Sequence, residues 1–191
     1  MKAYLTGTLA FCLLAACAQT DSTAGEADAT TAEATDTAMA EQPAGDPAAP
    51  TDAAGYLAKA GAGDMFEIES SRAILAKSPD KAVADFANMM IEHHTASTAK
   101  LKAAAAEAGL TVAPPALDAA QQAKLDGIKS ASGEAATTAY LAAQREAHPM
   151  ALALHQGYAA GGDTPQLKTA AGEIVLVVQR HIEALAKLPG A

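Results

Sequence analysis

Five histidines and one glutamate are the residues of this sequence best suited to chemistry. On helical wheels of about 100° per residue, Glu67 falls within the apolar arc of its own stretch, and every histidine falls on an apolar face or at its edge. The histidines are His93, His94, His148, His155 and His181. Imidazole is only intermediate in its tendency to be buried, so five scattered histidines would not usually all face inward.

Neutral imidazole and carboxylate groups inside a helical bundle are suitable ligands for iron, copper, zinc or manganese. The helical rise of about 1.5 Å per residue places four of these side chains in neighbouring layers and puts His155 in a layer of its own. The predicted metal ligands are Glu67, His94, His148 and His181, with His93 and His155 as secondary candidates. With one inward carboxylate and no inward Glu-x-x-His pair, a mononuclear site rich in histidine fits better than a di-iron site.

A purely structural interpretation stands beside the metal hypothesis. Buried polar groups need hydrogen-bond partners whether or not a metal is present. The histidines would then bond to one another, to Glu67, Ser71 or Ser97, or to backbone carbonyls, and would fix the register of the bundle.

The elements that position these side chains are predicted to be helices, because alanine dominates residues 53–191 and runs of β-branched residues are rare. Four long helices and one short helix are predicted, at 54–77, 80–108, 134–160 and 165–187, with the short one at 118–129. The breaks coincide with Pro79, Gly109, Pro114-Pro115 and the run 161–165. We therefore predict an all-α fold, an antiparallel four-helix bundle with one extra helix, in which Pro149 kinks or restarts a helix beside His148.

The first 16 residues have the layout of a secretory signal peptide, with Lys2 followed by an apolar stretch and small residues. Leu14-Ala15-Ala16-Cys17 resembles the lipobox of bacterial lipoproteins, so we predict cleavage before Cys17 and lipid attachment to its sulfur. Cleavage of an ordinary signal peptide at Ala16-Cys17-Ala18 is the alternative. Ala18 differs from the aspartate of an inner-membrane retention signal, which favours the periplasmic face of the outer membrane.

Residues 17–52 are predicted to be a disordered acidic tether after the lipidated cysteine, because they contain almost no large apolar side chain. They contain eight acidic residues and no lysine or arginine. Residues 53–191 contain 14 acidic and 12 basic residues, a net charge of −2, so most of the chain's formal charge of −9 belongs to the tether. Nothing in this charge distribution favours a nucleic-acid partner.

Several motifs resemble a bacterial family, the domain of unknown function 4142. They are the segments 65–71 and 86–95, the pair Ala147-His148 and the run Arg180-His181-Ile182. The resemblance covers about residues 54 to 188 and implies an exported protein with a ferritin-like fold. It matches Glu67, His94, His148 and His181 to residues of the family, places His93 where an acid is usual, and gives His155 no counterpart.

Two functional classes follow from the sequence. The first is an envelope lipoprotein that binds a transition metal, with iron, copper or zinc as candidate ions, for metal buffering or a stress-related role. The second is a non-catalytic structural or protein-interaction module that reaches an envelope partner through its tether. An enzyme is the less favoured class, because the sequence shows no nucleophile with an adjacent base and no phosphate loop.

Overall fold

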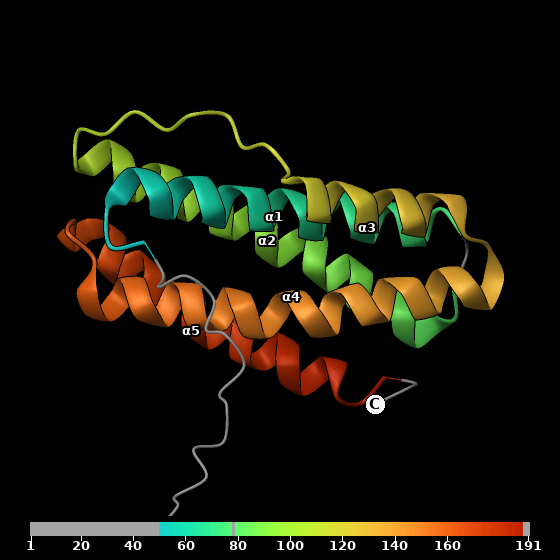
Figure 1. Ribbon diagram of the computed structural model, residues 1–191. Helices are drawn as coiled ribbons and strands as arrows, with labels where there is room; N and C mark the ends of the chain where they lie inside the picture. Colours follow the sequence, from blue (N-terminus) through green and yellow to red (C-terminus); the bar gives the residue numbers. More distant parts are fainter. Residues whose placement is uncertain (1–49, 78, 189–191) are drawn as a thin grey trace, which may run out of the picture. The chain divides into compact units, whose positions relative to one another are not determined.

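The computed structural model describes residues 50–77 and 79–188, and the regular secondary structure of these residues is entirely helical (Figure 1). The five helices are α1 (Ala53–Leu75), α2 (Lys81–Glu107), α3 (Ala119–Ser130), α4 (Gly133–Gly161) and α5 (Pro165–Leu185). The prediction of five helices is confirmed, with ends within about two residues of those expected. The predicted signal peptide, Cys17 and residues 18–49 of the predicted tether lie outside the described residues.

Local sequence explains where the helices begin and end. The Asp52 carboxylate accepts a hydrogen bond from the Gly55 backbone N–H at 2.7 Å, and Asp118 and Gln121 form a capping box at the start of α3. At the end of α2, Gly109 has a φ of 70°, and the Leu110 N–H donates to the Ala105 carbonyl at 2.9 Å. This is a Schellman motif, in which glycine adopts the left-handed conformation without a steric penalty.

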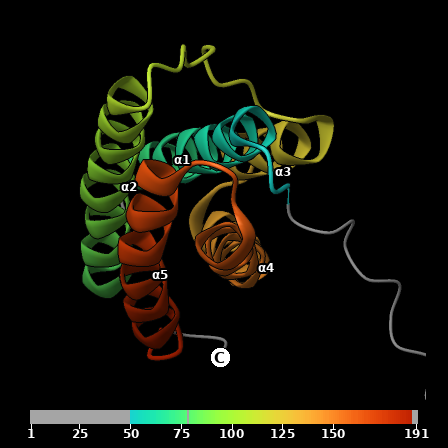
Figure 2. The same cartoon turned by 90° about the vertical axis from the view of Figure 1, so that its left-hand side faces the viewer.

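Four long helices surround a common interior. α1 packs against α2 and α4, α5 packs against the same two helices, and α3 lies on α1 and α4. Figure 2 looks nearly along α4 but sees α2 and α5 from the side, so these two helices cross α4 obliquely. The polar side chains discussed below come from all four long helices.

Two apolar clusters form the core, and a polar layer separates them. One cluster includes Phe66, Phe86 and Tyr140, and the other includes Tyr56, Leu101 and Ile174. Where the two clusters meet along the helices lie buried polar side chains, namely Asp64, Glu67, His94, Ser97, His148 and His181. Because unpaired buried polar groups destabilise a fold, this layer needs a physical explanation.

Pro149 does not interrupt α4. The helix is continuous from Gly133 to Gly161, and the Pro149 ring is exposed on its outer side. The predicted restart is therefore wrong, because the packing of α4 against α1, α3 and α5 outweighs the loss of one backbone hydrogen bond at Pro149.

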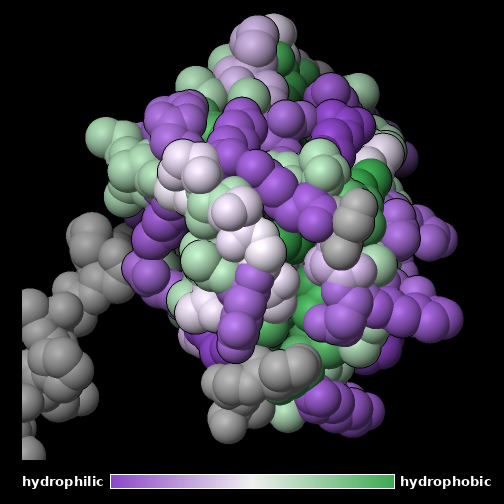
Figure 3. All heavy atoms as spheres, turned by 90° about the vertical axis from the view of Figure 1, so that its right-hand side faces the viewer, coloured by the Kyte–Doolittle hydropathy of each residue, from purple (hydrophilic) through white to green (hydrophobic). Residues whose placement is uncertain are grey.

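On the face of the domain drawn in Figure 3, hydrophilic and hydrophobic side chains are interspersed. Among the described residues, none of the helices combines the length and apolarity needed to cross a bilayer.

Candidate metal centre

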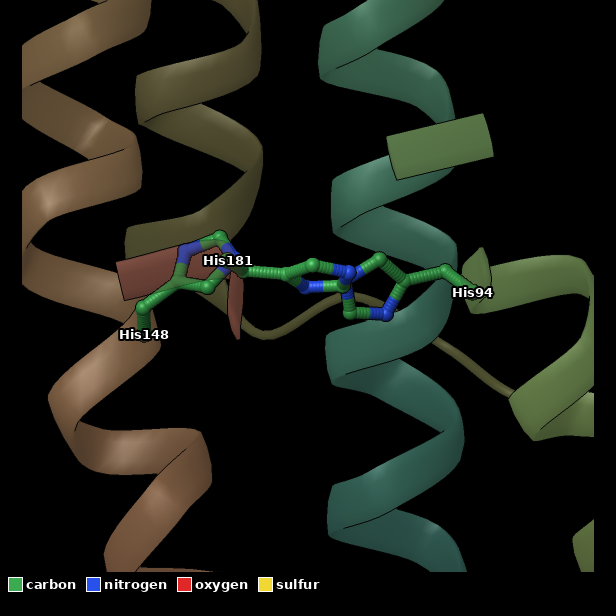
Figure 4. A group of neighbouring side chains, drawn as sticks. All are labelled: His94, His148 and His181. Carbon is green, nitrogen blue, oxygen red and sulfur yellow. The ribbon is translucent and has the colours of Figure 1, made fainter. Parts of the chain in front are cut away.

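Three histidines from three helices converge in the polar layer. His94 lies on α2, His148 on α4 and His181 on α5, and their rings point toward one another (Figure 4). One ring nitrogen from each lies within 4.8 Å of those from the other two. The side chains are 6%, 1% and 0% exposed, so water has almost no access to them.

Asp64 holds the His94 ring. The Nδ1 atom of His94 donates to Asp64 Oδ1 at 2.8 Å, and the Thr98 hydroxyl donates to Asp64 Oδ2 at 2.9 Å. The other ring nitrogen of His94, Nε2, is buried without a hydrogen-bond partner. A carboxylate behind a histidine is the usual arrangement for orienting a metal ligand and increasing its basicity.

The His148 ring is held by the backbone of its own helix. Its Nδ1 donates to the Gln144 carbonyl at 2.9 Å, which fixes the proton on Nδ1. Its Nε2 is buried and has no partner. A lone pair on Nε2 therefore faces the interior.

The His181 ring is held by His93, the first histidine of the His93-His94 pair. The His181 Nε2 and His93 Nδ1 atoms are 2.8 Å apart, and the two rings stack with centroids 5.1 Å apart. The remaining His181 nitrogen, Nδ1, is buried and unpartnered. His93 is half-buried, so it supports His181 from the outside and is not part of the converging group.

Glu67 is the carboxylate beside this group. It is 4% exposed, its Oε1 lies 3.9 Å from His148 Nδ1, and its Oε2 has no hydrogen-bond partner. The separation of 3.9 Å is too long for a hydrogen bond. The two groups are also not an ion pair, because burial lowers the pKa of His148 and keeps its imidazole neutral.

The pKa values of the three histidines diverge. Burial lowers the pKa of His94, but the Asp64 hydrogen bond and the charges of Glu67 and Asp64 together outweigh it, so the net shift is upward. Burial and the neighbouring imidazoles His94 and His148 lower the pKa of His181 to about 2. Two of the three rings are therefore neutral at physiological pH, and His94 must be neutral before its Nε2 can bind a metal.

The unpartnered atoms of the layer share one chemical property. They are Glu67 Oε2, His94 Nε2, Ser97 Oγ, Gln144 Oε1, His148 Nε2 and His181 Nδ1. The carboxylate, amide and hydroxyl oxygens and His148 Nε2 present lone pairs, and the serine hydroxyl also has a hydrogen to donate. His94 Nε2 presents one when that ring is neutral, and His181 Nδ1 presents one when His181 Nε2 donates to His93. A buried cluster in which lone pairs outnumber hydrogen-bond donors is a favourable environment for a cation, and three converging imidazoles are ligands that suit a transition metal.

The remaining predicted residue, His155, lies apart from this group. Its Nδ1 is 2.9 Å from the Tyr56 hydroxyl, and its side chain is 4% exposed. The prediction that all five histidines face inward or lie at a helix seam is confirmed. Within the described residues, the structure brings together His94, His148 and His181, with Glu67 adjacent, and places His155 with Tyr56.

Sequence reasoning missed Asp64 and Gln144. Asp64 is 4% exposed, so Glu67 is not the single inward carboxylate expected for the first helix. Its position carried a usable signal, because it lies four residues after the buried Ala60 and three before Glu67. Gln144 is one helical turn before His148, where its carbonyl is within reach of the imidazole.

The fold and the centre define a helical-bundle domain with a buried cluster of three histidines. The family described as "Domain of unknown function (DUF4142)" matches residues 21–188, and the chain belongs to this family. The resemblance suggested by the sequence motifs is therefore confirmed. Curated proteins show no match to the chain.

A solved structure shares the fold. It is described as "Crystal structure of DUF305 fragment from Deinococcus radiodurans". The TM-score is 0.62 at 16% sequence identity, and the alignment covers 74% of this chain and 96% of that fragment. At this identity the similarity concerns the arrangement of the helices alone.

Proposed function

We propose that this protein binds one transition metal ion through His94, His148 and His181, with Glu67, whose Oε2 has no other partner, as the candidate for a fourth position. The observation that carries the proposal is that the two nitrogens of each imidazole have different surroundings. One ring nitrogen is bonded to a carboxylate, a backbone carbonyl or another imidazole, and the other is buried without a partner. Outer partners of this kind are what fix the tautomer and orientation of metal-binding histidines.

The ligand set favours some ions over others. Imidazole suits zinc, copper and iron, whereas magnesium and calcium prefer sites made of oxygen atoms. Three imidazoles and one carboxylate are compatible with four-coordinate zinc and with copper or iron. No cysteine occurs after Cys17, so thiolate ligands do not contribute to this domain.

Burial of the whole ligand set supports a role in holding a metal, such as buffering or a stress response. All four candidate ligands are 6% exposed or less, which leaves little room for a substrate beside the ion. Catalytic metal sites usually keep a position open to water or substrate. We therefore infer a metal-binding protein and not an enzyme.

We further infer that the domain is carried by an envelope lipoprotein. Residues 1–16 would be the signal peptide, Cys17 the lipid-bearing residue, 17–52 a tether and 53–191 the metal-binding bundle. The lipobox-like sequence before Cys17 supports this division. The tether would let the bundle move about 30 to 35 Å from the periplasmic face of the outer membrane. The bundle itself is inferred to be ferritin-like, with α3 as the extra helix.

The competing function is a structural or interaction module in which the polar layer only fixes helix register. The hydrogen bonds that one nitrogen of each of His94, His148 and His181 makes are consistent with this structural function. The unpartnered nitrogens and oxygens favour metal binding, because side chains that only fix the helix register would be expected to bond to one another.

Metal uptake measured by native mass spectrometry tests the proposal. Protein purified without chelator is offered iron, copper and zinc in turn, and uptake of one ion per chain is expected. Ala substitution at His94, His148 or His181 should each abolish stoichiometric uptake. Glu69→Gln is the matched control, because Glu69 lies on α1 two residues from Glu67 and pairs with Arg72 at the surface.

Two results would end the proposal. One is a wild-type protein that takes up none of the three ions at stoichiometry. The other is uptake that is unchanged in all three histidine variants. Crosslinking in cells addresses the competing function, which gains support if an envelope partner is retained after the three histidines are replaced.

A further inference from the structure

A second buried polar group lies on the opposite side of Asp64 from the apolar cluster that contains Phe66. The Tyr56 hydroxyl and His155 Nδ1 are 2.9 Å apart, and both side chains are almost completely buried. The Tyr56 ring also stacks on the Tyr158 ring, with centroids 3.8 Å apart and an angle of 9° between the planes. Tyr158 in turn donates to Asp163 Oδ1 at 2.9 Å, and Asp163 is exposed.

Each tyrosine of this stack therefore has a proton acceptor. Burial lowers the pKa of His155 to about 4 and raises the pKa of Tyr56, so this pair is neutral, with the proton on the phenol. Hydrogen bonds from Thr164 and Tyr158 lower the pKa of Asp163, which is thus a carboxylate at physiological pH. A phenol bonded to a base can release its proton as it loses an electron, because the proton has only a hydrogen bond to cross.

The third buried tyrosine provides an internal contrast. Tyr140 is as deeply buried as Tyr56 and Tyr158, but its hydroxyl meets the Ser71 hydroxyl at 2.9 Å. A serine hydroxyl is not a base that accepts a phenol proton near neutral pH. Tyr140 is therefore as buried as Tyr56 and Tyr158, but it has no base to accept its proton.

The stacked pair is close to the three-histidine group. Tyr56 precedes Asp64 by eight residues on α1 and His155 follows His148 by seven on α4, which at the helical rise correspond to about 12 Å and about 10 Å. The charge of Asp64 acts on both Tyr56 and His155, and Asp64 is bonded to His94. Asp64 therefore lies close to both the Tyr56–His155 pair and the three-histidine group.

We propose that Tyr56, His155 and Tyr158 form a proton-coupled redox relay that carries an oxidising equivalent from Tyr56 to Tyr158, whose hydroxyl is bonded to the exposed Asp163. Tyr56 loses one electron to a one-electron oxidant, its O–H bond breaks, and the proton moves to His155 Nδ1. The Tyr56 radical then takes one electron from Tyr158 and recovers its proton from His155. Tyr158 passes its own proton to Asp163, so the radical ends beside a solvent-exposed carboxylate.

The relay needs a one-electron oxidant, and a redox-active ion bound by the three histidines would supply one in its higher oxidation state by taking up the electron that Tyr56 loses. This part rests on the proposed function. The relay would protect the histidine ligands, because the oxidising equivalent leaves the centre before it attacks an imidazole. The electron transfers themselves depend only on the tyrosines and their bases.

The first test uses metal-free full-length protein in which Tyr4 is replaced by Phe in every sample, so it depends neither on metal binding nor on a tyrosine outside the bundle. A ruthenium photosensitiser with a sacrificial electron acceptor oxidises the protein, and the trapped radical is observed by electron paramagnetic resonance. Wild type and Tyr140→Phe should give a tyrosyl radical of similar yield. The double variant Tyr56→Phe/Tyr158→Phe should lose it, and His155→Gln should reduce it, because an amide accepts the hydrogen bond but not the proton.

The outcomes separate the relay from simple packing. Equal radical yield in wild type and the double variant, or loss of the radical in Tyr140→Phe alone, overturns the relay. Tyr→Phe changes retain the rings, and circular dichroism checks that each variant is folded. Ring-deuterated tyrosine confirms that the radical is on tyrosine.

The second test adds hydrogen peroxide to copper-loaded protein and measures oxidation of His94, His148 and His181 by peptide mass spectrometry. Greater oxidation in Tyr56→Phe than in Tyr140→Phe supports the protective role, and equal oxidation contradicts it. If copper does not bind, the proposed function fails, while the photochemical test still decides whether the relay exists.

Discussion

Each imidazole of the candidate centre is oriented by a different kind of partner. Asp64 accepts from His94, the Gln144 carbonyl accepts from His148, and His93 bonds to His181. Of these partners, Asp64 carries a charge and raises the basicity of the ligand it holds. Its contribution to metal affinity should therefore be measurable by itself.

Asp64→Asn should weaken metal binding by about 10- to 100-fold, because an amide at this position no longer supplies the negative charge behind His94. Competition with a chelator of known affinity measures the effect. Asp85→Asn is the control, since Asp85 lies on the surface of α2 and pairs with Lys81. Equal affinities in the two variants would mean that Asp64 has no part in the site.

His155 should make the folded state sensitive to acid. Its pKa is lowered from 6.5 to about 4 in the folded protein, so the unfolded chain binds a proton first as the pH falls. The stability that depends on neutral His155 is complete above pH 6.5 and is lost progressively down to pH 4. The loss amounts to about 3 kcal/mol.

Urea unfolding at several pH values in metal-free protein measures this contribution as a difference. His155→Gln should remove that part of the pH dependence while the amide still accepts from Tyr56. The contributions of His148 and His181 remain in both proteins and cancel in the comparison. An unchanged slope in the variant would show that His155 is not held neutral by burial.

At the scale of the helices, periodicity and punctuation predicted most of the structure. Gly109 ends α2 as a left-handed residue, and Pro165 begins α5, both as their residue types require. The predicted restart at Pro149 was wrong because the tertiary packing of α4, which local sequence does not reveal, outweighs the loss of one backbone hydrogen bond. Asp64 was missed because aspartate is rarely fully buried without a partner, and its partners, His94 and Thr98, lie on another helix.

The geometry of the centre was predictable only in part. Wheels indicated which histidines face inward, but not which nitrogen of each ring is left free. That choice depends on partners from other turns and helices, such as Gln144 for His148 and His93 for His181. The oblique crossing of α2 and α5 over α4 could not be predicted either, because a helical wheel describes one helix and gives no angle between helices (Figure 2).

Two glycine substitutions should have opposite effects on stability. Gly109 has a φ of 70° and Gly127 lies within α3, and an added Cβ would meet nothing within 4 Å at either position. Gly109→Ala should cost about 1 to 2 kcal/mol through backbone strain, whereas Gly127→Ala should stabilise by about 1 kcal/mol. Thermal or urea unfolding measures both, and a change of the same sign in the two variants would contradict the assignment of the α2 terminus.

At the scale of the whole domain, a polar layer divides the core into two apolar clusters. Such a layer is destabilising while its inner atoms have no partners, and an ion that fills it should stabilise the fold. Free metal at about 100 times its dissociation constant should add about 2.7 kcal/mol to the free energy of unfolding. Thermal unfolding with and without metal measures the gain, and a chelator should reverse it; His181→Ala should show no gain.

The predicted anchor concerns the part of the chain outside the described residues. Cys17→Ser should move the protein from the membrane fraction to the soluble periplasmic fraction, because the acyl chains are the proposed means of membrane attachment. Detergent phase partitioning of cell fractions measures the change, with the wild-type protein as reference. Membrane association that persists in Cys17→Ser would contradict lipid anchoring at this residue.

The central claim is that one metal ion lies among His94, His148 and His181. Anomalous diffraction from crystals grown with zinc locates the ion directly. The account predicts one peak inside the bundle, about 2.0 to 2.1 Å from one nitrogen of each of the three rings. Peaks confined to the protein surface, or none at all, would contradict it.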